Sequence, residues 1–126
     1  MNININVSVA ELVDKITILE IKSEKINDLK KLENIKNELA LLNKSFKHIE
    51  TEKLLNLKDK LKQINLKLWN IEDDIRKCEK NKVFDDSFIQ LARDVYITND
   101  ERFNVKNSIN ELFSSKIKEV KSYEDY

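Results

Sequence analysis

Hydrophobic positions between residues 54 and 78 form the longest regular pattern in the chain. They recur at intervals of 3, 4, 3, 4, 3, 4 and 3 and are Leu54, Leu57, Leu61, Ile64, Leu68, Ile71, Ile75 and Cys78. This spacing is typical of a helix that packs along one narrow stripe against another helix. It predicts one long helix from Thr51 to Lys80, against which the remaining segments fold.

The N-terminal part predicts an extended arm followed by two shorter helices. Hydrophobic residues at positions 3, 5, 7 and 9 alternate with polar ones, which predicts a short strand within an arm over residues 1–7. Ser8 and Glu11 have the spacing of a capping box, so a broadly apolar, central helix is expected from there. Asn27 and Asp28 then interrupt the pattern and start a second helix. Since neither helix matches the long one in length, we expect them to lie end to end along it.

The C-terminal part predicts a loop over residues 81–86 and two further helices. The first carries Phe88, Leu91 and Val95 on one face, and the second begins at a capping box formed by Thr98 and Glu101. A tail over residues 114–126 follows, in which apolar residues such as Ile117 stand among charges. The fold class expected is all-α: residues 1–126 form a single helical domain, an elongated antiparallel bundle or coiled-coil-like hairpin of about five helices, with a short N-terminal strand.

Composition supports a helical protein and excludes several classes of function. The chain has no glycine and no proline, which removes the residues of tight turns and helix breaks as well as the glycine-rich phosphate loop. It has 23 basic and 23 acidic residues, so no net field attracts nucleic acid or an anionic membrane. Cys78 is the only cysteine and His48 the only histidine, too few for a usual zinc site. With no apolar run long enough for a signal peptide or membrane span, we expect a cytoplasmic protein with Cys78 as a reduced core residue.

Four carboxylates at helical spacing suggest one form of chemistry. Glu20 and Glu24 lie one turn apart in the first helix, and Glu72 and Asp73 lie in the long helix. Four such groups can bind Mg²⁺, which prefers oxygen ligands, as in all-helical nucleotide hydrolases. The alternative is ion pairing, in which Glu72 contacts Arg76 and Glu20 contacts a cation of a neighbouring helix.

Two other clusters suggest binding rather than catalysis. Trp69, Glu72 and Arg76 share one helix face, and a tryptophan edged by charges is typical of an interface, although it equally fits ordinary core packing. A second cluster could bind a phosphate or carboxylate near a helix start, or meet the acidic residues across a helix interface. Its members are Arg93, Tyr96, Asn99, Arg102 and Lys106.

Three blocks of the sequence resemble a family of small all-helical bacterial and phage proteins known only as a domain of unknown function. They are VSVAELVDKITILEIK from Val7 to Lys22, LWNIEDDIR from Leu68 to Arg76, and FIQLARDVYITND from Phe88 to Asp100. The resemblance implies an all-helical soluble protein and carries no activity or catalytic residues. Polar positions inside the blocks are Asp14, Lys15, Glu20, Glu72, Asp73, Arg76, Arg93, Asn99 and Asp100.

The function expected from these patterns is a protein-interaction or assembly module that acts as a homo-oligomer, most simply a homodimer, and that needs no cofactor. The long uncharged stripe and the spare apolar surface of the first helix and the tail favour this hypothesis. Two alternatives stay open. One is a Mg²⁺-dependent nucleotide or sugar-nucleotide hydrolase that uses the four carboxylates, and the other is a binder of a small phosphate or carboxylate ligand.

Overall fold

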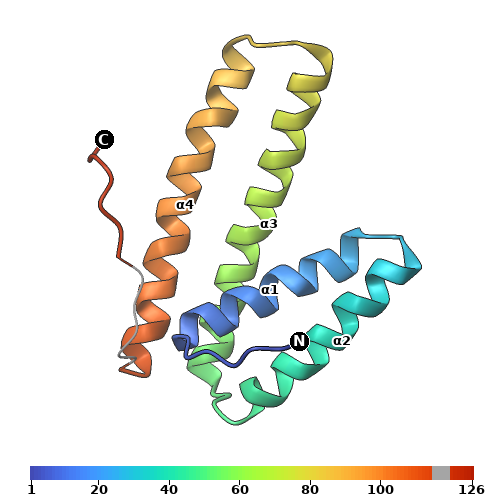
Figure 1. Cartoon of the computed structure of the whole chain (residues 1–126). Helices are drawn as coiled ribbons and strands as arrows, with labels where there is room; N and C mark the ends of the chain where they lie inside the picture. Colours follow the sequence, from blue (N-terminus) through green and yellow to red (C-terminus); the bar gives the residue numbers. More distant parts are fainter. Residues whose placement is uncertain (115–119) are drawn as a thin grey trace.

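Two antiparallel helical hairpins cross each other in the computed structural model, which describes residues 1–114 and 120–126. The first hairpin consists of α1 (Val9–Lys25) and α2 (Leu29–Lys47), and the second of α3 (Glu52–Asn81) and α4 (Asp86–Leu112). Helix α1 packs against α2, α3 and α4, and it crosses the lower part of the long hairpin (Figure 1). The upper part of α3 and α4 therefore extends beyond the first hairpin.

Side-chain caps set the starts of the four helices. Ser8, Asp28, Thr51 and Asp85 each accept a hydrogen bond from the backbone N–H three residues later, at 3.1–3.3 Å. These bonds satisfy donors that a helix start would otherwise leave free. Because the chain lacks glycine, Lys82 takes the left-handed conformation that ends α3, with φ 55°.

The core lies where α1 crosses the long hairpin. The side chains of Val13 and Ile16 from α1, Leu54 and Leu61 from α3 and Ile109 from α4 are all fully buried. The broad apolar surface of α1 thus serves three neighbouring helices, as its sequence predicts. The predicted long helix is also confirmed, since Thr51 caps α3 and its stripe faces the core and α4.

The prediction of about five helices and a short strand was wrong in both respects. The described residues contain four helices and no strand, because residues 1–8 are extended without a pairing partner. The two predicted C-terminal helices are one helix, α4, which runs through Thr98 and Glu101. Thr98 is fully buried inside α4, and its hydroxyl has no hydrogen-bond partner among residues 1–114 and 120–126, so it does not cap a helix. A cap sequence alone does not break a helix when no glycine or proline accompanies it.

The first two helices also differ from the prediction. The chain turns at Ile26 to Asp28 as expected, but α2 folds back beside α1 instead of continuing along α3 (Figure 1). Ile35 and Phe46 of α2 are buried in this arrangement. If α1 and α2 lay end to end, α1 would not cover these two side chains. The apolar surface of α1 is wide enough to pack against both α2 and the long hairpin, which explains why α2 folds back beside α1.

The part of the long hairpin beyond α1, residues 72–97, has no buried side chain. We call it the distal hairpin. Its inner positions Ile75, Cys78 and Val95 are half-buried between the two helices, whereas Phe84 at the turn and Ile89 are more than half exposed. Two helices alone form a thin layer that cannot enclose a core, so the distal hairpin leaves apolar surface exposed to solvent.

Candidate functional site

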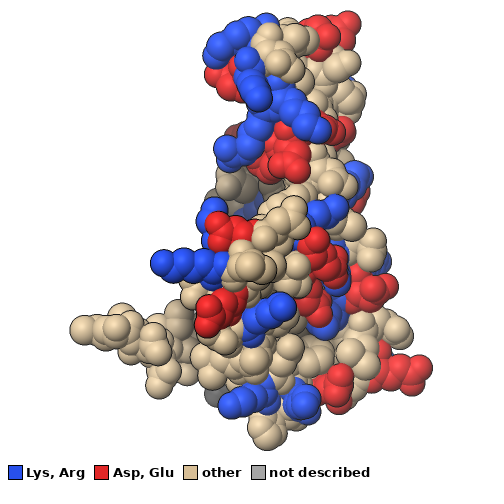
Figure 2. Space-filling model, turned by 90° about the vertical axis from the view of Figure 1, so that its right-hand side faces the viewer, with Lys and Arg blue, Asp and Glu red and all other residues tan. Residues whose placement is uncertain are grey.

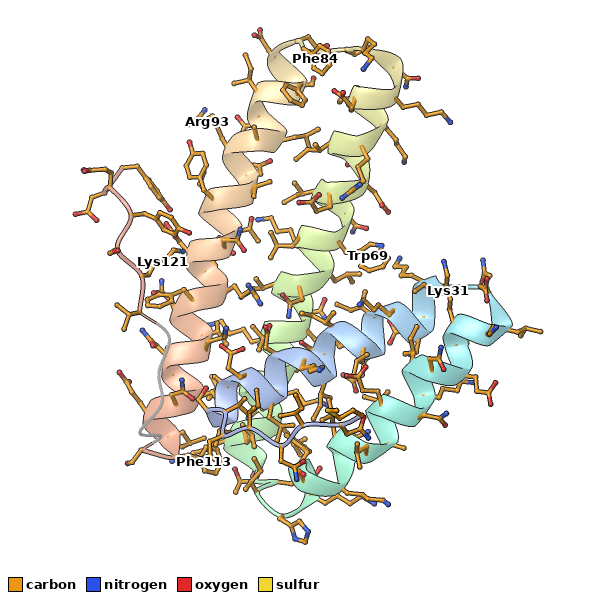
Figure 3. The ribbon with its side chains drawn as sticks, in the orientation of Figure 1. Lys31, Trp69, Phe84, Arg93, Phe113 and Lys121 are labelled. Atoms are coloured by element: carbon orange, nitrogen blue, oxygen red, sulfur yellow. The ribbon has the colours of Figure 1, made fainter. Side chains whose placement is uncertain are left out.

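A groove with a volume of about 530 Å³ lies where α1 leaves the side of α3. Its inner wall is apolar, with Ile18 and Ile21 from α1 and Leu68 and Trp69 from α3, while its rim is polar. The remaining lining residues are Asn65, Glu72, Asp73, Arg76 and Arg102. Figure 3 shows Trp69 projecting from α3 on the side away from α4, above α1. The groove is thus an apolar recess bordered by charges of both signs.

A buried polar network forms the base of the groove and joins three helices. Asp14 of α1 accepts hydrogen bonds from Asn65 Nδ2 at 2.9 Å and from Arg102 Nε at 3.1 Å, and a second Arg102 nitrogen contacts its other oxygen. The amide of Asn65 also donates to Thr17 Oγ1 at 3.0 Å. Asp14 is 4% exposed, so its charge is neutralised by partners from α3 and α4 rather than by water.

The same network continues toward the start of α1. Lys106 Nζ lies 2.8 Å from Glu11 Oε1 and 4.0 Å from Asp14 Oδ2, although its side chain is only 5% exposed. Asn110 Oδ1 accepts a hydrogen bond from the backbone N–H of Ala10 at 3.0 Å. Buried polar groups of this kind require specific partners, so they fix the angle at which α1 crosses the long hairpin.

The sequence predicted only part of this network. Arg102 and Lys106 do meet acidic residues across a helix interface, which was one of the two alternatives, but the acidic residues are Asp14 and Glu11 of α1. Asp14 and Thr17 stand among the apolar residues Val13 and Ile16, and Asn65 follows the stripe residue Ile64. A polar residue inside an apolar face was the available signal for Asp14 and Asn65. Which of these polar residues is buried depends on the crossing of the two hairpins, which the sequence pattern does not specify.

The structure divides the four predicted carboxylates into two pairs. Glu20 and Glu24 contact lysines of α3: Lys58 lies 3.2 Å from Glu20, and Lys62 lies 2.8 Å from Glu24. The hydrogen bond to Glu24 raises the pKa of Lys62. Glu72 and Asp73 lie instead on the groove rim, where Glu72 is 3.8 Å from Arg76. Over residues 1–114 and 120–126, no group of three or more acidic, histidine or cysteine side chains is placed to hold a metal ion.

The residues predicted to bind an anion are also separated. Arg102 and Lys106 contact Asp14 and Glu11 in the buried network. Arg93 is exposed on the distal hairpin, Asn99 is half-buried, and Tyr96 stacks edge-on against Tyr126 with ring centroids 5.3 Å apart. The two cations nearest the core are therefore engaged by carboxylates of α1.

The predicted interface residues, in contrast, do share one site. Trp69, Glu72 and Arg76 all line the groove, because positions three and four apart face the same side of α3. Trp69 is half-buried, while Glu72 and Arg76 are exposed. The groove is therefore the place in the described structure where a predicted cluster and a recess coincide.

The end of the chain forms a second polar contact, on α4. Lys121 pairs with Asp100 and lies over the ring of Phe103, 5.4 Å from its centroid, and Tyr126 donates a hydrogen bond to Asp100. The predicted tail thus returns along α4 over residues 120–126 (Figure 1), whereas Ile117 lies outside the described residues. The hydrogen bonds from Lys121 and Tyr126 lower the pKa of Asp100, and the bond to Asp100 raises the pKa of Tyr126.

These shifts predict that the tail contact depends on pH. The lowered pKa of Asp100 means that the contact is strongest above the ordinary aspartate pKa, about 3.9, and weakens as the pH falls through the lowered value. The raised pKa of Tyr126 means that the contact is complete below about pH 10 and weakens above it. Amide NMR shifts of Tyr123 and Tyr126 should therefore move toward random-coil positions at both extremes.

The variant Tyr126→Phe serves as the control for this titration. It should make the alkaline step smaller and leave the acid step in place, since Lys121 still pairs with Asp100. Amide shifts that stay constant across both extremes would contradict the assignment of the contact to Asp100.

The fold and groove define a class: an all-α protein of two crossed helical hairpins, joined by a buried ion-pair network and open at an apolar groove. The chain belongs to the family of unknown function DUF6165, which matches residues 3–126. This finding confirms the resemblance to a family of unknown function. Neither a curated protein nor a solved structure matches the chain. None of the helices over the described residues is both long and apolar enough to cross a membrane.

Proposed function

We propose that the protein is a protein-interaction module that assembles as a homo-oligomer, with the groove beside Trp69 as its contact site. The observation that carries this proposal is the groove itself: a half-buried tryptophan among isoleucine and leucine, bordered by exposed charges. Protein interfaces commonly have this arrangement, with an apolar centre and a polar rim.

The groove suits a protein surface better than a small charged ligand. Arg102 is held by Asp14, and Arg76 lies near Glu72, so each cation already has a carboxylate close by. A small anion would have to compete with these carboxylates, whereas an apolar side chain from another protein would fill the recess and leave the rim pairs intact. Tryptophan in such a recess is a frequent hot spot of binding energy.

Sedimentation velocity over a wide range of concentration tests the proposal. We expect the wild-type protein to associate as its concentration rises and Trp69→Ala to weaken this association at least about thirtyfold, which corresponds to a hot spot of about 2 kcal/mol. Because Trp69 is the only tryptophan, its fluorescence should shift to shorter wavelength in parallel with association.

Leu41→Ala is the matched control for Trp69→Ala. Leu41 is 62% exposed on α2, away from the lining residues of the groove, so its removal should leave association unchanged. A wild-type protein that is monomeric at every concentration, or an equal effect of both substitutions, would overturn the proposal.

A further inference from the structure

One stripe of α3 is covered by α1 in its first half and uncovered in its second half. In the covered half, Lys58, Lys62 and Asn65 contact Glu20, Glu24 and Asp14 of α1. The same helical spacing continues at Trp69, Glu72, Asp73, Arg76 and Lys80, and no helix of the described residues covers this second half (Figure 1). A helix-packing surface thus extends past the point where α1 ends its contact.

Charges along the uncovered stripe are ordered by sign. The acidic residues Glu72 and Asp73 come first, and the basic residues Arg76 and Lys80 follow. Figure 2, which views this side of the molecule, shows a basic group on its upper part directly above an acidic group. Within the described residues, Asp73 and Lys80 have no ion-pair partner, and the Glu72–Arg76 pair is mostly exposed at 54% and 79%.

This order makes the stripe complementary to a copy of itself that runs in the opposite direction. Two antiparallel stripes place the acidic residues of each beside the basic residues of the other, whereas two parallel stripes would place like charges together. A two-fold axis produces this antiparallel arrangement, and it is the commonest symmetry of protein dimers.

We propose that a second copy of this chain packs its α3 antiparallel on this stripe, about a two-fold axis between residues 74 and 75. The inference rests on the proposed function and names its partner and geometry. In this register Asp73 faces Arg76 of the partner subunit, and Trp69 faces Lys80 of the partner subunit, where a cation can lie over the indole ring. Each contact occurs twice.

The same register also supplies an occupant for the groove. Residues near position 84 of one copy lie opposite residues near position 65 of the other, at the inner end of the groove. Val83 and Phe84 at the hairpin turn are 44% and 51% exposed, and Ile21 and Leu68 line the recess that would receive them. The dimer therefore covers spare apolar surface at the turn as well as the groove.

Charge reversal at Asp73 and Arg76 tests this register. Asp73→Arg places like charges opposite each other in its own homodimer, and Arg76→Asp does the same, so each variant alone should associate at least about tenfold more weakly than wild type. Both residues are exposed, so both variants should keep the wild-type circular dichroism spectrum.

Mixing the two variants is the decisive step. In the mixed dimer, the introduced arginine of one chain would face the introduced aspartate of the other at one contact, and the original Asp73 and Arg76 would meet at the second contact. We therefore expect the mixture, and also the double variant Asp73→Arg/Arg76→Asp, to associate within about threefold of wild type. The control pair Glu33→Arg and Lys36→Asp makes the same charge changes at exposed positions of α2, away from the stripe and the groove, and should not affect association.

The outcomes separate this inference from the proposed function. If Trp69→Ala weakens association but the mixture of charge variants does not recover it, the antiparallel register is wrong while the groove remains a contact site. If charge reversal has no effect at either position, the stripe is not the interface. If the wild-type protein does not associate at all, both proposals fail.

Discussion

Replacing Asp14 with alanine is expected to lower the free energy of unfolding by about 3 kcal/mol, the low end of the range for breaking a buried ion pair. The substitution removes the carboxylate that Asn65 and Arg102 contact from two other helices. The loss should not be larger because Arg102 is partly exposed, at 28% of its side chain, and Lys106 keeps its contact with Glu11. Urea denaturation followed by circular dichroism measures the change.

Asp74→Ala provides the comparison for Asp14→Ala. Asp74 is 54% exposed and lies 3.8 Å from Lys77 in a surface ion pair, so its removal should cost no more than about 0.5 kcal/mol. Equal losses of stability for the two alanine variants would show that the buried network contributes no more than an ordinary surface pair.

Truncating Leu61 to alanine is expected to destabilise the protein by about 2–5 kcal/mol, the range observed for buried leucine. Leu61 is fully buried in the core cluster where α1 crosses α3, and its loss leaves a cavity between two hairpins that the ion-pair network holds at a fixed angle. Thermal denaturation should show a melting temperature about 10 °C lower.

Leu55→Ala is the matched substitution on the same helix. Leu55 is 41% exposed, so its truncation should cost clearly less, within about 1 kcal/mol. Similar losses at the two positions would mean that the core does not lie at the predicted stripe of α3.

Local sequence patterns predicted the helices far better than their arrangement. The cap residues Ser8, Asp28 and Thr51 and the stripe beginning at Leu54 identified three helix starts and the long helix. The same reasoning divided α4 at Thr98, because the sequence does not distinguish a threonine that caps a helix from one that is buried within a helix. Whether a threonine caps a helix or is buried within one depends on the helices that cover it.

The candidate site was predicted in part for the same reason. Trp69, Glu72 and Arg76 could be grouped because they belong to one helix, and helical spacing alone brings them together. Asp14, Asn65 and Arg102 come from three helices, and only the crossing of the hairpins brings them into contact. The contact of Glu20 with a cation of a neighbouring helix was one of the sequence alternatives, but that this cation is Lys58 of α3 follows only from the same crossing.

The position at which α1 crosses the long hairpin makes resistance to unfolding uneven along α3 and α4. Near Leu61 and Ile109 a side chain can leave its place only if three helices separate, whereas near Cys78 and Phe88 two helices need only part from each other. The free end of the hairpin is thus the part that opens at least cost, and its backbone amides are the first that water can reach. A binding partner that holds this end would slow the hydrogen exchange of its backbone amides and leave the exchange rates near the crossing of α1 unchanged.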